Sequence, residues 1–163
     1  MKGINMFNDD VSMKQKMTDL AIEKLLVKKL EPPKIAKVKK ELNESKVALI
    51  TSAGVHLKTQ EAFDGKNGDP TYRIIPNNIR KEELTITHGH YDQSEADKDI
   101  NCVFPIERLN ELEADNIIGS VATNHYGFMG FIQNLEPLIN EYAPEVVKKL
   151  VEDSVDIAIF SPA

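Results

Sequence analysis

The sequence has little cysteine, few aromatic residues and no long hydrophobic run. Its 163 residues include one cysteine, Cys102, and no tryptophan, and aromatic residues make up 6% of the chain. A single thiol cannot form an internal disulfide framework, which excludes a disulfide-stapled fold and indicates a reducing compartment. No segment approaches the roughly 18 apolar residues that a membrane helix needs, and the N-terminus lacks the pattern of a secretory signal. The composition therefore predicts a cytoplasmic protein that does not cross a membrane.

Acidic residues outnumber basic ones, with 26 Asp and Glu against 20 Lys and Arg. The net charge is -6, and charged residues make up 28% of the chain. An acidic chain with few aromatic side chains offers no electrostatic footprint for a phosphate backbone, so nucleic-acid binding is not expected. The basic stretch at 34–40 is either a solvated helix face or a contact for a partner. A hydrophobic content of 41% is sufficient for one compact core.

The N-terminal part, residues 1–45, is predicted to be a helical extension of the main domain at 46–163. Apolar residues between Leu20 and Leu30 recur at the i, i+3, i+4 spacing of an amphipathic helix, which would end at Glu31-Pro32-Pro33. A second short helix is expected at about 35–42.

The main domain alternates predicted strands with predicted helices. Lys46–Thr51 is a short apolar run with polar neighbours, which is typical of a buried strand in a parallel sheet. This alternation predicts an α/β fold, layered and Rossmann-like, with a mostly parallel sheet. The other predicted elements are strands at Tyr72–Ile75, Leu84–His88, Ile117–Ile118 and Val155–Phe160, and helices at Pro105–Glu113 and Leu135–Val151, the latter interrupted near Pro144.

The predicted last strand, Val155–Phe160, is followed by Ser161-Pro162-Ala163 and no helix. A buried parallel strand needs a covering layer on both faces. We therefore expect the fold to be incomplete at its C-terminus, so that the natural polypeptide continues or a partner element covers this strand.

A histidine-rich motif lies at Thr87-His88-Gly89-His90-Tyr91-Asp92. It is similar to the metal-binding run of metallo-β-lactamase-fold hydrolases, but Gln93 stands where that family continues with a further histidine. A stable zinc site needs three or four protein ligands, so no metal is expected here. His88 and His90 either bond to loop backbone at a strand end, or bind or protonate a small carboxylate substrate.

Cys102 precedes the proline-initiated helix predicted at Pro105. Such a cysteine is either a small packing residue or a thiol whose ionised form is favoured by a nearby helix N-terminus. Both interpretations remain open from the residues alone.

Further candidate site residues lie in two segments, one just after Gly54 and one just before Gly127. His56 and Lys58 come after the first strand, where ligands bind in open α/β sheets, and we expect them to contact an anion or a carboxylate. The chain there lacks the G-x-G-x-x-G pattern of a dinucleotide site. His125 lies in a glycine-containing segment that is either a surface loop or a functional loop.

Six runs of this sequence, taken together, resemble the selenoprotein B family of glycine, sarcosine, betaine and D-proline reductases, and within it the D-proline reductase branch. The resemblance covers about residues 46–163. The runs are T-S-A-G-V-H-L-K at 51–58, G-D-P-T-Y-R-I-I-P at 68–76, T-H-G-H-Y-D at 87–92, D-I-N-C-V-F-P-I-E-R-L at 99–109, N-H-Y-G-F-M-G at 124–130 and V-D-I-A-I-F-S-P at 155–162.

The resemblance implies an amino-acid reductase that opens the ring of D-proline to 5-aminovalerate. It implies a selenocysteine just beyond Ala163, where a UGA codon read as a stop would end the chain, so that the chain alone would be inactive. It also implies a pyruvoyl group on a partner subunit and a thiol protein as electron donor. By this resemblance His56, Lys58, His88 and His90 are candidates for substrate binding, and Cys102 and His125 are candidate catalytic residues.

Three alternatives remain. The chain could serve the glycine, sarcosine or betaine branch of the same family. It could be a noncatalytic α/β subunit that binds a larger partner. A metallohydrolase is the third alternative, and it requires a third metal ligand beside His88 and His90, for which His125 is the candidate.

Overall fold

The computed structural model describes residues 36–89 and 91–162. The helix predicted between Leu20 and Leu30, and His90, lie outside the described residues. The described fold belongs to a compact unit that spans Val38–Ala163. The division predicted at residue 45 stays a prediction.

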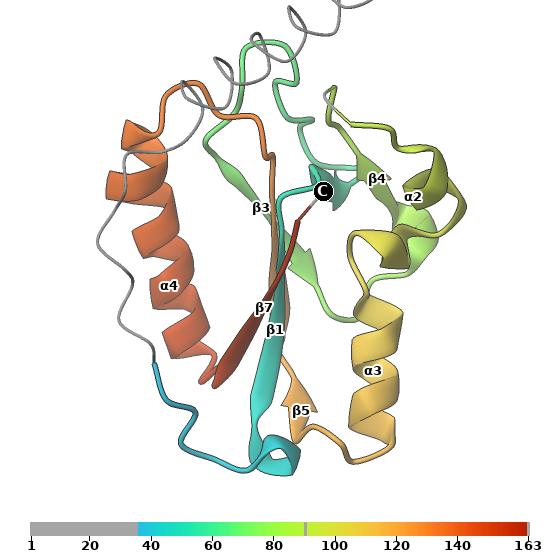
Figure 1. Cartoon of the computed structure of the whole chain (residues 1–163), viewed down its shortest axis with the longest axis vertical. Helices are drawn as coiled ribbons and strands as arrows, with labels where there is room; N and C mark the ends of the chain where they lie inside the picture. Colours follow the sequence, from blue (N-terminus) through green and yellow to red (C-terminus); the bar gives the residue numbers. More distant parts are fainter. Residues whose placement is uncertain (1–35, 90, 163) are drawn as a thin grey trace, which may run out of the picture. The chain divides into compact units, whose positions relative to one another are not determined.

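The centre of the fold is strand β1 (Lys46–Thr51), which is buried along most of its length. Along one side it pairs in parallel with β5 (Ser120–Val121) and β6 (Asn124–Phe128), and along the other side with β7 (Ile157–Ser161). β3 (Tyr72–Pro76) pairs antiparallel with β6 and forms the far edge. This mostly parallel sheet with helices confirms the predicted α/β fold (Figure 1).

A small second sheet pairs β2 (Val55–Leu57) antiparallel with β4 (Leu84–Ile86). β2 follows β1 directly through Gly54, whose φ of +74° lies in the left-handed region that glycine adopts at low cost. The strand predicted at Leu84–His88 is present but ends at Ile86.

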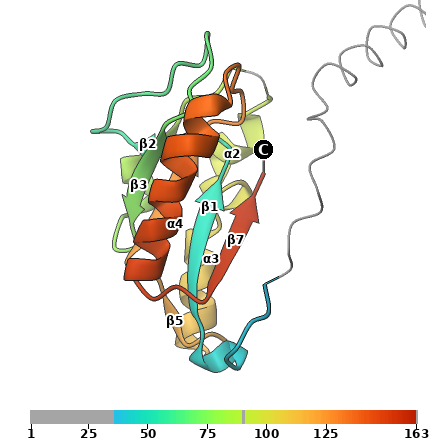
Figure 2. The same ribbon diagram turned by 90° about the vertical axis from the view of Figure 1, so that its left-hand side faces the viewer.

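Helices cover the main sheet on both faces. α2 (Ser94–Lys98) and α3 (Ile106–Ala114) lie on one face, and α4 (Ala143–Glu152) lies on the other (Figures 1 and 2). Because side chains of a strand alternate between faces, Leu49 of β1 packs in the core on the α3 side and Ile50 packs on the α4 side. The predicted helix at Pro105–Glu113 is confirmed as α3.

The predicted interruption near Pro144 corresponds to a π-helical turn, η4 (Leu138–Tyr142), which runs directly into α4. The N–H of Ala143 donates to the carbonyl of Leu138, five residues back. Pro144 comes next and has no N–H to continue that ladder, so regular α-helical bonding begins afresh from the first turn of α4.

Two predictions of local structure were wrong. Residues 36–41 are not helical, and only a 3₁₀ turn, Leu42–Glu44, follows them. Lys40 instead forms an ion pair with Asp156, 2.8 Å away, just before β7. Ile117 and Ile118 do not form a strand, because both N–H groups donate to the carbonyl of Leu112 and so cap the end of α3.

β7 is an apolar strand at an edge of the sheet. It pairs with β1, and among the described residues no strand pairs with its other side. Phe160 and Ile159 at its end are 72% and 41% exposed. Figure 2 shows β7 at the margin of the sheet, with α4 in front of the sheet. Val147 and Val151 of α4 are also exposed. The described part of the chain therefore leaves this edge without the covering layer that a parallel sheet requires.

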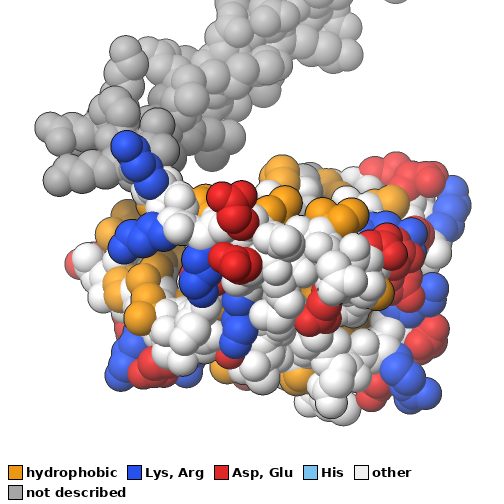
Figure 3. Space-filling model, turned by 90° about the horizontal axis from the view of Figure 1, so that it is seen from below, with side chains coloured by type: hydrophobic (Ala, Val, Ile, Leu, Met, Phe, Trp, Pro, Cys, Tyr) orange, Lys and Arg blue, Asp and Glu red, His pale blue; other side chains and the backbone are white. Residues whose placement is uncertain are grey.

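The surface carries charged side chains of both signs. On the face shown in Figure 3, Lys and Arg side chains are interspersed with Asp and Glu. Within 36–89 and 91–162, no helix has the length and apolar character required to cross a membrane.

Candidate functional site

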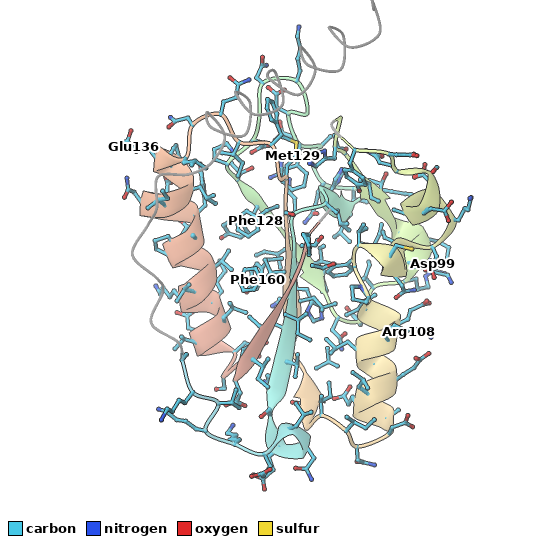
Figure 4. All side chains as sticks on the ribbon, in the orientation of Figure 1. Asp99, Arg108, Phe128, Met129, Glu136 and Phe160 are labelled. Carbon is cyan, nitrogen blue, oxygen red and sulfur yellow. The ribbon has the colours of Figure 1, made fainter. Side chains whose placement is uncertain are left out.

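The parallel strands β1, β6 and β7 all end at the same edge of the sheet. The N–H of Ser52, after β1, donates to the carbonyl of Ser161 at the end of β7, with an N–O distance of 3.1 Å. The N–H of Gly54 donates to the carbonyl of Phe128 at the end of β6, at 2.8 Å. Phe128 and the residue that follows it, Met129, are labelled in Figure 4. Met129 is fully buried. This edge is where ligands bind in open α/β sheets.

His88 lies at this edge. A Cβ atom placed on Gly130, two residues after β6, would be 3.3 Å from His88 Nε2 and 3.2 Å from the carbonyl oxygen of Ser52. The imidazole of His88 is therefore close to the ends of both β1 and β6. We use the name strand-end site for Ser52, His88, Gly130 and Ser161.

The loop that carries His88 is tied to the end of β1. Thr87 N–H donates to the Gly54 carbonyl at 2.9 Å, and Tyr91 Oη donates to the Ala53 carbonyl at 3.2 Å. The side-chain amide of Gln93 donates to the carbonyl of His88. At Gly54 a Cβ atom would lie only 2.3 Å from the Thr87 oxygen, so the loop closes on β1 at a distance that only glycine allows.

His56 is buried beneath this loop and both of its ring nitrogens have partners. Nδ1 lies 2.8 Å from the carbonyl oxygen of Leu57, and Nε2 lies 2.8 Å from Thr87 Oγ1. A carbonyl only accepts, so Nδ1 carries the proton and Nε2 accepts from the Thr87 hydroxyl. His56 thus supports the loop carrying His88 through Thr87, and its predicted contact with substrate stays a prediction.

Lys58 is exposed and lies in a different place. It lines an open pocket of about 380 Å³ between β4 and α2, together with Lys81, Asp97 and Lys98. None of the described histidines lines this pocket. The structure therefore does not bring Lys58 together with His88.

His125 is fully buried in β6, so the interpretation of this segment as a surface loop was wrong. Its Nδ1 accepts from the N–H of Leu49 at 2.9 Å, and its Nε2 lies 3.4 Å from Asn77 Oδ1. Burial lowers the pKa of His125 to about 4, against an opposing effect of Asp153. The imidazole is therefore neutral at pH 7, with its proton on Nε2.

Cys102 ends the 3₁₀ turn Ile100–Cys102 that leads towards α3, and it is exposed. Its interpretation as a buried packing residue was therefore wrong. Its neighbour Phe104 is the buried one, and packs edge-on against His125 with ring centroids 5.9 Å apart. The predicted catalytic role of Cys102 stays a prediction.

No group of three or more His, Cys, Asp or Glu side chains within 36–89 and 91–162 is arranged to hold a metal ion. His90, one of the two histidines that would begin such a site, lies outside the described residues.

Sequence reasoning did not name Ser52, Tyr91 or Gly130 as candidates for this site. Ser52 immediately follows the predicted buried strand, a position that could have indicated it. Tyr91 lies inside the histidine motif and Gly130 lies in the segment around His125. Their contacts join parts of the chain that are far apart in sequence, which no local pattern reveals.

The comparisons with known proteins agree with the resemblance. The model of the family "glycine/sarcosine/betaine reductase selenoprotein B" matches residues 1–163. D-proline reductase subunit gamma of Acetoanaerobium sticklandii is 35% identical over 89% of this chain and 62% of its own length. Glycine reductase complex component B subunit gamma of Peptoclostridium acidaminophilum is 26% identical over 96% of this chain and 38% of its own length.

Sarcosine reductase complex component B subunit beta of the same organism is 25% identical over 75% of this chain and 29% of its own length. The chain thus spans less than two thirds of the length of each of these relatives. No solved structure matches it. With the family model matching from end to end, and with a mostly parallel α/β sheet that gathers a histidine and two serines at its strand ends, this chain belongs to the selenoprotein B family of amino-acid reductase complexes.

Proposed function

We propose that this chain is part of the selenocysteine-bearing subunit of a D-proline reductase. The identity of 35% to D-proline reductase subunit gamma, against 29% or less for the glycine and sarcosine reductase subunits, supports the D-proline branch. The reaction adds two electrons and two protons across the ring bond between nitrogen and the α-carbon, giving 5-aminovalerate. A dithiol protein that becomes a disulfide supplies the electrons.

The observation that carries this proposal is the junction of β7 with β1. The hydrogen bond between Ser52 N–H and the Ser161 carbonyl fixes the end of β7 next to Ser52, and the carbonyl of Ser52 and the His88 imidazole both lie near Gly130. A reactive residue that follows Ala163 would emerge at this edge. This chain covers 62% of the length of D-proline reductase subunit gamma, so that relative has a longer polypeptide.

In this proposal the selenocysteine supplies a nucleophile that is ionised near neutral pH, and a pyruvoyl group on a partner subunit binds the amino acid. The part belonging to this chain is to hold the substrate at the strand ends. His88 would donate a hydrogen bond to the substrate carboxylate or hold a proton for the departing nitrogen. The backbone of Ser52 and Gly130 would form the floor beneath it.

The first experiment is to sequence the gene beyond the codon for Ala163, and to measure the mass and the selenium content of the protein from its native source. We expect an in-frame TGA, further coding sequence and one selenium atom per subunit. A different stop codon together with a native mass of 163 residues would contradict the proposal, and would favour a noncatalytic partner-binding subunit.

The second experiment tests the substrate. The complete reductase, with its pyruvoyl subunit and a dithiol donor, is assayed with D-proline, glycine, sarcosine and betaine. We expect 5-aminovalerate from D-proline and no comparable turnover of the other three. Turnover of glycine, sarcosine or betaine instead would assign the chain to another branch of the same family. The chain of residues 1–163 alone is expected to be inactive in all four assays.

The other proposed site residues can be tested one at a time in the complete reductase. Cys102→Ser, His56→Gln, Lys58→Met, His90→Gln and His125→Gln each remove one candidate group. A substituted residue in contact with the substrate should change kcat/KM by about 100-fold, whereas a remote residue should change it less than about threefold. Tyr72→Phe on the β3 edge is the control for a remote side chain.

A further inference from the structure

The backbone on both sides of His88 is fixed, but its ring is not fixed by those contacts alone. Thr87 N–H bonds to Gly54, and the carbonyl of His88 accepts from Gln93. These bonds determine where the Cα atom lies. A histidine ring can still rotate about two side-chain torsions, so a further contact is needed to aim it.

Tyr91 supplies such a contact. Its ring packs edge-on against the His88 ring, with centroids 4.9 Å apart and an angle of 67° between the planes. This is the geometry that aromatic pairs prefer, and it restricts rotation of both rings. Tyr91 is three residues beyond His88, so the contact also closes the loop upon itself.

The hydroxyl of Tyr91 is attached to the sheet itself. It donates to the carbonyl oxygen of Ala53 at 3.2 Å. Ala53 is fully buried, forms a bridge with Met129, and its own N–H donates to Thr51 Oγ1 at 3.1 Å. Ala53, which accepts the bond from Tyr91, is thus held in place by the ends of β1 and β6. Burial, with a smaller effect of Asp97, raises the pKa of Tyr91, so the hydroxyl keeps its proton for this bond.

We propose that Tyr91 is a positioning residue, which holds the His88 imidazole in the strand-end site by attaching it to the end of β1. This inference rests on the role given to His88 in the proposed function. Tyr91 is placed to act through His88, and its hydroxyl is already engaged by Ala53. Loss of the hydroxyl should loosen the ring of His88 while the fold is kept.

A spectroscopic test does not depend on activity. The chain has four histidines, so each imidazole can be assigned in ring ¹H–¹⁵N spectra by single His→Gln substitutions. We expect Tyr91→Phe to broaden or shift the signals of His88, and Tyr91→Leu to do so more strongly, while the signals of His56 and His125 stay in place. Unchanged His88 signals in Tyr91→Leu would overturn the inference.

A kinetic test uses the complete reductase and a double-mutant cycle. Tyr91→Phe should lower kcat/KM about tenfold in the wild-type background but less than about twofold in the His88→Gln background, because its effect passes through His88. Tyr72→Phe, which loses a hydroxyl bonded to Glu145 at 2.9 Å, is the matched control and should change neither background. Equal losses from Tyr91→Phe in both backgrounds would overturn the inference.

Failure of the proposed function would look different. If His88→Gln left D-proline turnover intact, His88 would not belong to the catalytic machinery. The spectra would then decide the positioning contact alone. Displaced His88 signals in Tyr91→Leu would support it, and undisturbed signals would overturn it.

Discussion

At the scale of single residues, His125 is a part of the sheet's own bonding. β5 and β6 pair with β1 at Val47 and at Ile50, and between these two points the Leu49 N–H has the imidazole of His125 as its acceptor. The ring therefore bridges the gap where the strand that pairs with β1 is interrupted. A protonated ring could not accept this bond at Nδ1.

The low pKa of His125 makes stability depend on pH. The unfolded chain takes up this proton below about pH 6.5, whereas the folded chain does not do so until about pH 4. Stability should therefore fall as pH drops through this window, by about 3 kcal/mol in total from this group. Urea unfolding between pH 4 and 8 measures the slope. His125→Gln should remove its share of that slope while leaving the pH 7–8 region flat. An unchanged acid slope in His125→Gln would contradict the assignment.

Gly127 lies where the fold leaves no room for a side chain. A Cβ atom there would lie 2.0 Å from the backbone oxygen of Val55, where β2 begins. We expect Gly127→Ala to lower the free energy of unfolding by about 3 kcal/mol or more, or to prevent folding. Gly65→Ala is the control, because its nearest neighbour would be at an ordinary 3.6 Å. Equal denaturation midpoints for the two variants would show that β2 can move away.

Sequence reasoning proposed His88 as a site residue but could not predict its contacts. The histidine motif indicated a strand end, and the structure puts His88 there. Which histidine would be buried could not be predicted, because this depends on the strand against which it packs. His56 and His125 are equally polar in the sequence, yet both are enclosed by residues from distant parts of the chain.

At the scale of elements, α4 is joined to the antiparallel edge of the sheet by a pair of polar side chains. Tyr72 Oη in β3 donates to Glu145 Oε2 in α4 at 2.9 Å. Tyr72 also contacts the rings of Tyr126 and Tyr142. Burial of the phenol, followed by its bond to Glu145, raises the pKa of Tyr72 to about 12.

Titration of the tyrosines tests this junction. The chain has four tyrosines, and tyrosinate absorbance should show one that ionises near pH 12. The folded pKa exceeds the unfolded value of 10, so this contribution to stability is present below pH 10 and is lost as pH rises towards 12. Glu145→Gln should lower the pKa of Tyr72, and Glu141→Gln in the preceding π-helical turn should not. A pKa of Tyr72 that Glu145→Gln leaves unchanged would assign the shift to burial alone.

The elements that were predicted correctly share a clear pattern. β1 is an unbroken apolar run, and α3 begins after a proline, so both could be identified from local sequence. β6 was missed because His125 and Gly127 interrupt its apolar pattern, although both are buried. β2 has only three residues, too few for any period to be visible.

At the scale of the whole molecule, the β7 edge is the most exposed apolar feature described. Within 36–89 and 91–162 no strand pairs with its outer side, and Phe160 is 72% exposed. An uncovered apolar edge strand pairs readily with another chain. The molecule is therefore expected to associate through this edge at high concentration.

A charge on β7 should suppress that association. Phe160→Lys should leave the denaturation midpoint almost unchanged, since the side chain is largely exposed, and should reduce the concentration dependence of light scattering. Leu42→Lys, at a turn away from the edge and 48% exposed, is the matched control and should have little effect. If both variants reduced association equally, association would depend on exposed apolar surface in general and not on the edge of β7.

The bond between Leu49 and His125 has a consequence for hydrogen exchange in the sheet. Most amides in β1 are protected from exchange with solvent because they donate to carbonyls of neighbouring strands. Mild acid does not protonate these carbonyls. The Leu49 amide is held by a ring that acid can protonate. This one amide, at the centre of the sheet, thus reports the ionisation of a buried base, and its exchange with deuterium in mild acid should accelerate before that of its neighbours in the same strand.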